Sequence, residues 1–129
     1  MSSPATRQET ETRRASLEMS AEAFRAAGHR LVDEIAEFLE SIPSRPVVPA
    51  ATAAEIRKQV GTGGLPQKGA DPGQLLDEAS RILFNGSLLS AHPRFWGYIY
   101  SCGSPLGALG DFLASAVNPN VGGWVLSPT

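Results

Sequence analysis

The sequence predicts a mainly α fold, with several short helices joined by extended linkers. Apolar residues recur at helical spacing in four separate stretches, and each stretch starts at a residue type that commonly caps a helix. Thirteen glycines and ten prolines lie mostly between these stretches, where they interrupt helices. The 129 residues are 42% hydrophobic, which is enough for the core of one small domain.

The longest helix is expected at about 21–41. Ser20 is a suitable N-cap because its hydroxyl can accept a hydrogen bond from an otherwise unpaired N–H of the first turn. Met19 and Phe24 are spaced to form a hydrophobic staple across that cap. Pro43 ends the helix because proline cannot continue it. One apolar stripe follows its length, made of Phe24, Leu31, Ile35, Phe38, Leu39 and Ile42.

Three shorter helices are expected at about 53–60, 72–84 and 105–117. The first begins at a capping box, in which Thr52 and Glu55 satisfy each other's backbone N–H groups. The other two begin with an N-cap residue followed by proline at the first helical position. These two starts are Asp71-Pro72 and Ser104-Pro105.

The composition excludes several classes of function. Residues 1–18 are polar and mix arginine with glutamate, so they are expected to form a disordered tail rather than an export or transit signal. The net charge is −2 and the basic residues are scattered, so neither nucleic acid nor a membrane is an expected partner. The only cysteine, Cys102, excludes an internal disulfide, and no metal site is expected. A cytoplasmic location is the simplest interpretation.

One stretch, His92–Asp111, reads HPRFWGYIYSCGSPLGALGD and gathers four aromatic rings within six positions. The rings precede a Gly/Ser turn and a helix start, an arrangement typical of the wall of a ligand pocket. The alternative is an ordinary buried strand whose rings belong to the core. Pro93 and the rings together favour an extended, strand-like path at the start of the stretch.

No complete catalytic set is present in the chain. Ser101, Ser104 and His92 are close in sequence, but nothing orients a Ser–His pair and no nucleophile elbow occurs. Lys58 and Lys68 are the only lysines, and both lie in polar surroundings. A Schiff-base lysine needs a buried or cation-flanked site, so neither lysine is a persuasive candidate.

The amino-acid sequences of two stretches resemble those of a known family. HPRFWGYIYS, followed by SPLGALGDFLASAVNPNVGGWVLSP, is similar to the segment that opens pyridoxal-phosphate-dependent amino-acid decarboxylases, the group that includes the aromatic-amino-acid decarboxylases. Upstream, Phe24–Gly28 and Leu31–Asp33 resemble the F-R-x-x-G-x-x-x-V-D pattern of that family's first helix. The resemblance runs from about Met19 to Thr129, but it matches only the N-terminal part of such an enzyme.

This resemblance implies the N-terminal segment of a fold type I, transferase-type enzyme. Residues 19–91 would be a helical segment that packs against the partner subunit of a homodimer, and 92–129 would begin the cofactor domain. The first helix is therefore expected to stand apart from a compact core and to present its apolar stripe outward. The complete enzyme would be a carboxy-lyase that acts on an L-amino acid and uses pyridoxal phosphate as its cofactor.

The family's aldimine lysine and other catalytic residues lie downstream of the matched segment. No catalytic, cofactor-binding or metal-binding residue is therefore expected in this chain, and the chain alone is expected to be inactive. The resemblance places Tyr98 and Ser101 in the wall of the substrate pocket. Aromatic-specific members usually carry threonine at the position of Ser101 and proline at that of Tyr100. They also carry larger apolar residues at the positions of Asn120 and Gly122, so the departures weigh against an aromatic substrate and leave a smaller or more polar amino acid open.

Two further interpretations remain open from the sequence. The chain could be a stand-alone helical module that binds another protein through its apolar faces, without catalysis. It could also be a small binding domain that uses the aromatic stretch as a ligand cleft. The sequence stops at Ser127-Pro128-Thr129, which spells a helix start without a helix behind it, and this favours a truncated chain.

Overall fold

The computed structural model describes residues 18–61, 63–64, 66, 68–99, 101–120, 122–123, 125 and 127. Within this part the chain forms the helices α2 (Ala21–Ser41), α3 (Ala53–Val60), α4 (Pro72–Gly86) and α5 (Pro105–Val117). A 3-10 turn, η1 (Ile42–Ser44), extends α2, and none of the described residues lies in a strand. The mainly helical prediction is confirmed. Residues 1–17, most of the predicted tail, lie outside the described residues.

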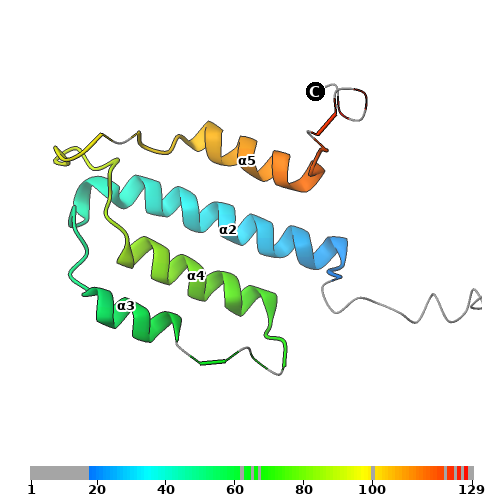
Figure 1. Cartoon of the computed structure of the whole chain (residues 1–129), viewed down its shortest axis with the longest axis horizontal. Helices are drawn as coiled ribbons and strands as arrows, with labels where there is room; N and C mark the ends of the chain where they lie inside the picture. The colour runs from blue at the N-terminus through cyan, green and yellow to red at the C-terminus, as the bar shows by residue number, and fades with distance from the viewer. Residues whose placement is uncertain are drawn as a thin grey trace, which may run out of the picture.

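The helices lie side by side in the order α5, α2, α4 and α3 (Figure 1). In the same view α2 and α4 run in one direction, while α3 and α5 run in the opposite one. The parallel pair is possible because the long connection through α3 carries the chain back before α4 begins. The helices α2 and α4 are therefore the two inner members of the array, and α2 lies between α4 and α5.

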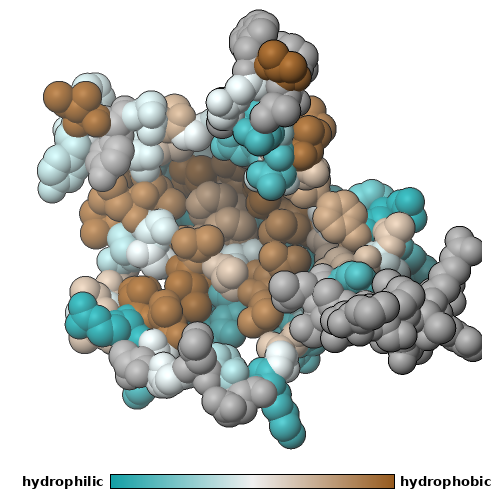
Figure 2. Space-filling model, turned by 45° about the vertical axis from the view of Figure 1, so that its right-hand side comes forward, coloured by the Kyte–Doolittle hydropathy of each residue, from teal (hydrophilic) through white to brown (hydrophobic). Residues whose placement is uncertain are grey.

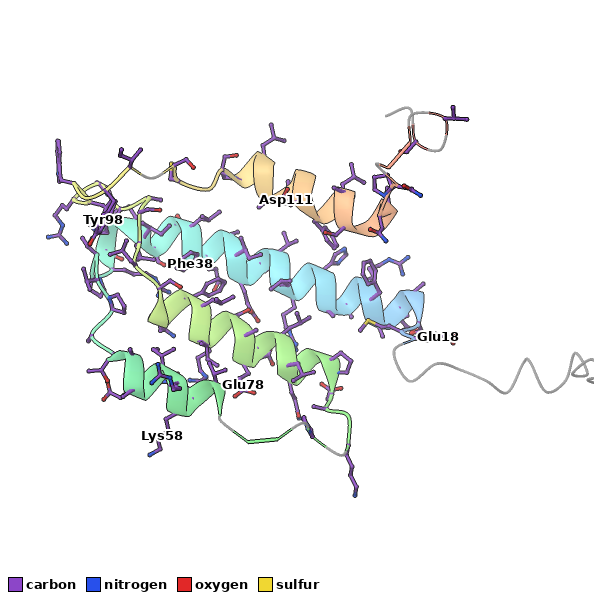
Figure 3. All side chains as sticks on the ribbon, in the orientation of Figure 1. Glu18, Phe38, Lys58, Glu78, Tyr98 and Asp111 are labelled. Atoms are coloured by element: carbon purple, nitrogen blue, oxygen red, sulfur yellow. The ribbon has the colours of Figure 1, made fainter. Side chains whose placement is uncertain are left out.

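The expectation that α2 stands apart from the other helices is wrong. Phe38 of α2 stacks on Phe84 of α4 with ring centroids 4.2 Å apart, and it lies between these two helices in Figure 3. Phe24 also faces Phe112 of α5 at 6.1 Å. The stripe is nevertheless only partly covered, since Phe24 remains 53% exposed. Long-range pairing of apolar rings, which local spacing does not encode, explains the difference.

Two arginines, Arg45 and Arg30, connect α2 and the turn after it to α4 through hydrogen bonds and an ion pair. The Arg45 guanidinium donates hydrogen bonds of 3.2 Å to the Phe84 carbonyl and to Asn85 Oδ1, at the C-terminal end of α4. It also lies over the Phe38 ring, 5.0 Å from its centroid. At the other end of the pair, Arg30 forms an ion pair of 2.8 Å with Asp77. A cation at a helix C-terminus is stabilising because the last carbonyls lack partners within the helix.

The predicted helix caps all form. In each case the side chain accepts a hydrogen bond from a backbone N–H three residues on: Ser20 from Ala23, Thr52 from Glu55, Asp71 from Gln74 and Ser104 from Gly107. The end of α4 differs from the prediction, because the helix continues two residues past 84 to Gly86. At that position a Cβ atom would lie 2.7 Å from Ile56 Cδ1, so the glycine lets α3 pack closely against the helix end.

Candidate substrate-pocket edge and apolar groove

The aromatic stretch follows a turning path between α4 and α5 rather than the strand-like path expected from its sequence. The His92 N–H donates to the Leu89 carbonyl at 3.1 Å, and the Phe95 N–H donates to the His92 carbonyl at 2.9 Å. These two bonds close successive turns around Pro93. The turns satisfy the backbone locally, so no neighbouring strand is needed.

The candidate substrate-binding residues lie just after these turns. Tyr98 is 86% exposed, and its backbone adopts a φ of 56°, in the left-handed region that few non-glycine residues occupy. Ser101 is also exposed and lies four residues before Pro105, where α5 starts. Trp96 is 94% exposed, so the alternative of an ordinary buried strand is wrong for this ring and for Tyr98. Tyr100 lies outside the described residues.

His92 is the buried member of the stretch, with only 4% of its surface exposed. Its Nδ1 accepts a hydrogen bond of 3.0 Å from the Arg94 backbone N–H. An accepting Nδ1 places the ring proton on Nε2, and that buried nitrogen has no hydrogen-bond partner. An unpaired buried donor costs about 1–3 kcal/mol. Because Nε2 is closed to solvent, the imidazole is unavailable as an acid or base for an external substrate in this conformation.

An apolar groove of about 430 Å³ lies along α2 and beneath α5. Its lining includes Phe24 and Leu31 of α2, Leu76 of α4, and Leu109 and Phe112 of α5. Figure 2 shows apolar side chains gathered around a hollow on one face of the molecule. Every side chain of α5 is exposed, so this helix covers the groove only loosely.

Neither candidate site residue lines this groove. A second hollow of about 350 Å³ lies between the C-terminal ends of α2 and α4 and the loop that follows, and it reaches Gly103 and Ser104. Tyr98 and Ser101 are absent from its lining as well. The described structure therefore brings the two residues to the same end of the helix array without enclosing them in a cavity.

Neither lysine lies in a site that could hold an aldehyde cofactor bound covalently to its side chain. Lys58 is exposed on α3 and projects away from the other helices (Figure 3), and Lys68 is exposed in the linker before α4. Among the described residues no group of three or more His, Cys, Asp or Glu side chains is placed to hold a metal ion. No described helix is long and apolar enough to cross a membrane.

One carboxylate has a shifted pKa, and its role is structural. The Thr52 backbone N–H donates to Glu55 Oε2 at 2.7 Å, and the Thr52 hydroxyl lies 2.8 Å from the same oxygen. These hydrogen bonds, the backbone one first, hold the pKa of Glu55 below its ordinary value of 4.5. Because the carboxylate caps α3 on the open surface, it is not a candidate general base.

Sequence reasoning missed two residues that shape this region. Arg45 lies just beyond the end of α2, and its only sequence signal is a basic residue soon after a helix C-terminus. For His92, the sequence suggests only a pairing with a nucleophilic serine. The sequence signal for its observed role is a side-chain acceptor followed by proline, a pattern typical of a turn.

Comparison with known proteins gives a consistent set of relatives. No family model matches the chain. It is 31% identical over 109 residues to an aromatic-L-amino-acid decarboxylase of Bacillus atrophaeus, a match that covers 84% of this chain and 22% of that protein. It is 32% identical over 112 residues to a tyrosine decarboxylase of Oryza sativa subsp. japonica, covering 85% of this chain and 21% of the relative. An aromatic-L-amino-acid decarboxylase of Rattus norvegicus is 28% identical over 110 residues, a match that covers 85% of this chain and 23% of that protein. The chain thus spans about a fifth of the length of these relatives.

Proposed function

We propose that this chain, a homologue of the aromatic-amino-acid decarboxylases over most of its length, is the N-terminal segment of a pyridoxal-phosphate-dependent amino-acid decarboxylase. The observation that carries the proposal is the set of matches, each of which covers about 85% of this chain and about a fifth of a decarboxylase. The helical fold agrees with such a segment. A cytoplasmic location and an L-amino-acid substrate are parts of the same proposal.

The first role in this proposal is to make contacts between two subunits of a homodimer. Support comes from the apolar groove and from the exposed apolar side chains of α5, among them Leu106 at 80% and Leu113 at 67%. Apolar surface of this kind is typical of an interface. The second subunit would cover the groove and remove these side chains from water.

Sedimentation of the natural protein that contains these residues tests the dimer. We expect the wild-type protein to sediment as a dimer, and Leu109→Glu to weaken the association by at least about tenfold, since it places a charge in apolar surface. Val60→Glu is the matched control, because Val60 is an exposed apolar residue of α3 outside the groove. A monomeric wild-type protein at high concentration would contradict this role.

The second role is to form one edge of the substrate pocket with Tyr98 and Ser101. Support comes from the family resemblance at these positions and from the exposure of both side chains, which leaves them accessible to another part of the protein. When bound elsewhere in the enzyme, pyridoxal phosphate supplies the electron sink for loss of the carboxyl group. Tyr98 and Ser101 would select and orient the substrate side chain and would take no part in the covalent step.

Substrate ranking tests this second role. Ser101→Leu in the natural protein should change the relative kcat/KM among amino acids, because one added apolar group in a pocket changes discrimination about 10-fold or more. Ser87→Leu, at an exposed position after α4, is the control. The panel should include aromatic and smaller amino acids, since the names of the relatives indicate aromatic substrates and the residue at Ser101 departs from that pattern. An unchanged ranking in Ser101→Leu would refute the assignment.

A stand-alone protein-interaction module is the alternative function. The exposure of every α5 side chain favours it, because such a helix can dock on an unrelated protein as well as on a second subunit. Purification of the natural protein distinguishes the two. A polypeptide that decarboxylates amino acids supports the enzyme, whereas one that lacks this activity over the full panel supports the module.

A further inference from the structure

We propose that His92 is a positioning residue for the candidate pocket edge, and that its Nδ1 fixes the turn from which Tyr98 and Ser101 project. This inference rests on the proposed function for its effect on substrate choice. Its structural part stands on the contacts of His92 alone. His92 is 4% exposed, whereas Trp96, Tyr98 and Ile99, which follow it, are all more than 85% exposed.

A chain of hydrogen bonds runs through His92, from the segment after η1 to the turn at Arg94 and Phe95. The Leu89 N–H donates to the Val47 carbonyl at 3.0 Å, which ties the start of the loop to the segment after η1. His92 then donates from its own N–H to Leu89, and accepts from Arg94 at Nδ1 and from Phe95 at its carbonyl. The side chain thus fixes the peptide of Arg94, inside the last turn before the exposed aromatic residues.

The unpaired Nε2 argues for this role. A leucine or phenylalanine could fill the same buried space without leaving a donor unpaired. What the imidazole adds, and those residues lack, is the acceptor at Nδ1. The bond to Arg94 is therefore the interaction that offsets the unpaired nitrogen.

The backbone of Tyr98 gives an independent reason for an anchor. A tyrosine at a φ of 56° is strained, and such a conformation persists only where neighbouring structure holds the chain. Tyr98 has no regular helix or strand around it within the described residues. Among the described residues, the buried one nearest to it in sequence is His92, six residues before it.

Two substitutions in the natural protein separate the acceptor from the packing. His92→Asn keeps an acceptor, since an asparagine side chain bonds the backbone N–H two residues on in an Asx turn. His92→Phe keeps the ring volume and removes the acceptor. We expect His92→Phe to raise KM for the preferred amino acid about fivefold, the equivalent of one net hydrogen bond, with a smaller change in kcat. It should also alter the ranking of substrates, and His92→Asn should restore the wild-type ranking and KM.

Hydrogen exchange at the Arg94 amide gives a readout that does not need activity. We expect this amide to be protected in the wild-type protein and in His92→Asn, and to exchange about tenfold faster or more in His92→Phe. Circular dichroism identifies a variant that fails to fold. If His92→Phe fails, His92→Leu takes its place and the same comparison with His92→Asn decides.

The outcomes distinguish this inference from the proposed function. If the wild-type protein has no decarboxylase activity, the proposed function fails, while Arg94 exchange still tests the anchor. If the wild-type protein is active and His92→Phe leaves both the substrate ranking and Arg94 exchange unchanged, the positioning role is refuted. It is also refuted if His92→Asn behaves like His92→Phe, because packing rather than the acceptor would then matter.

Discussion

The α2–α4 pair and α5 carry similar apolar side chains, yet they are held to the molecule very differently. Between α2 and α4, a close ring stack at Phe38 lies under the Arg45 guanidinium, and Arg30 closes the other end. The helix α5 has the looser contact of Phe112 with Phe24, and all of its side chains are exposed. The difference indicates that this chain covers one apolar surface by itself and leaves another exposed.

Removing one ring from each region tests that comparison most strongly. Phe38→Ala should destabilise the protein by about 2–3 kcal/mol, because it leaves a cavity opposite Phe84 in a partly covered site. Phe112→Ala should cost about 0.5–1 kcal/mol, because Phe112 is already 49% exposed in the folded chain. Urea unfolding of both variants provides the measurement. Equal losses would show that the two regions are held equally firmly.

A smaller effect is expected when the arginine at the helix ends is replaced. Arg45→Met keeps much of the aliphatic contact but leaves the Phe84 carbonyl and Asn85 without their donor, so we expect a loss of about 1–2 kcal/mol. Arg25→Met, at an exposed position early in α2, is the matched control. If Arg45→Met and the control have equal thermal unfolding midpoints, the hydrogen bonds of Arg45 do not stabilise the α2–α4 pair. The stacking of Phe38 on Phe84 would then be what holds the two helices together.

The smallest effect concerns the cap of α3 and depends on pH. Because the pKa of Glu55 is lower in the folded chain than its ordinary value of 4.5, its carboxylate stabilises the folded state fully above that value. This contribution is lost as the pH falls through the folded pKa. In Glu55→Gln the side chain can still cap but cannot titrate. The difference between the urea midpoints of the wild-type protein and Glu55→Gln should therefore change as the pH falls below 4.5. A difference that stays constant down to pH 3 would contradict the role of the carboxylate.

Local signals predicted the helices well because their causes are local. Each N-cap bonds an N–H three residues away, so the starts at residues 21, 53, 72 and 105 could be determined from short windows of sequence. The sequence predicts an end of α4 that is two residues too early, because Asn85-Gly86 is usually a stop signal. Here Arg45, 40 residues away in the sequence, bonds Asn85, and Ile56 packs against Gly86. Contacts at such separations are not visible in a local pattern.

The candidate site shows the same limit more strongly. Spacing and composition indicated that the aromatic stretch was unusual, but they predicted an extended path. The direction of the loop depends on whether the imidazole of His92 faces the solvent or the backbone of Arg94, and the sequence does not show which. The inner position of α2 was likewise unpredictable, because the pairing of Phe38 with Phe84 joins residues 46 positions apart.

The parallel arrangement of α2 and α4 also has a consequence during synthesis of the chain. The α4 residues that contact α2 and the turn after it lie about 39 to 46 positions behind their partners in the sequence. The bonds of Arg45 to Phe84 and of Arg30 to Gly73 show this, as does the stack of Phe38 on Phe84. At a translation rate of about 5–20 residues per second, the α4 residues are made about 2–9 s after the α2 residues that they contact. Its apolar stripe is exposed to the cell throughout that interval, so a chaperone can bind α2 before α4 is available to pack against it.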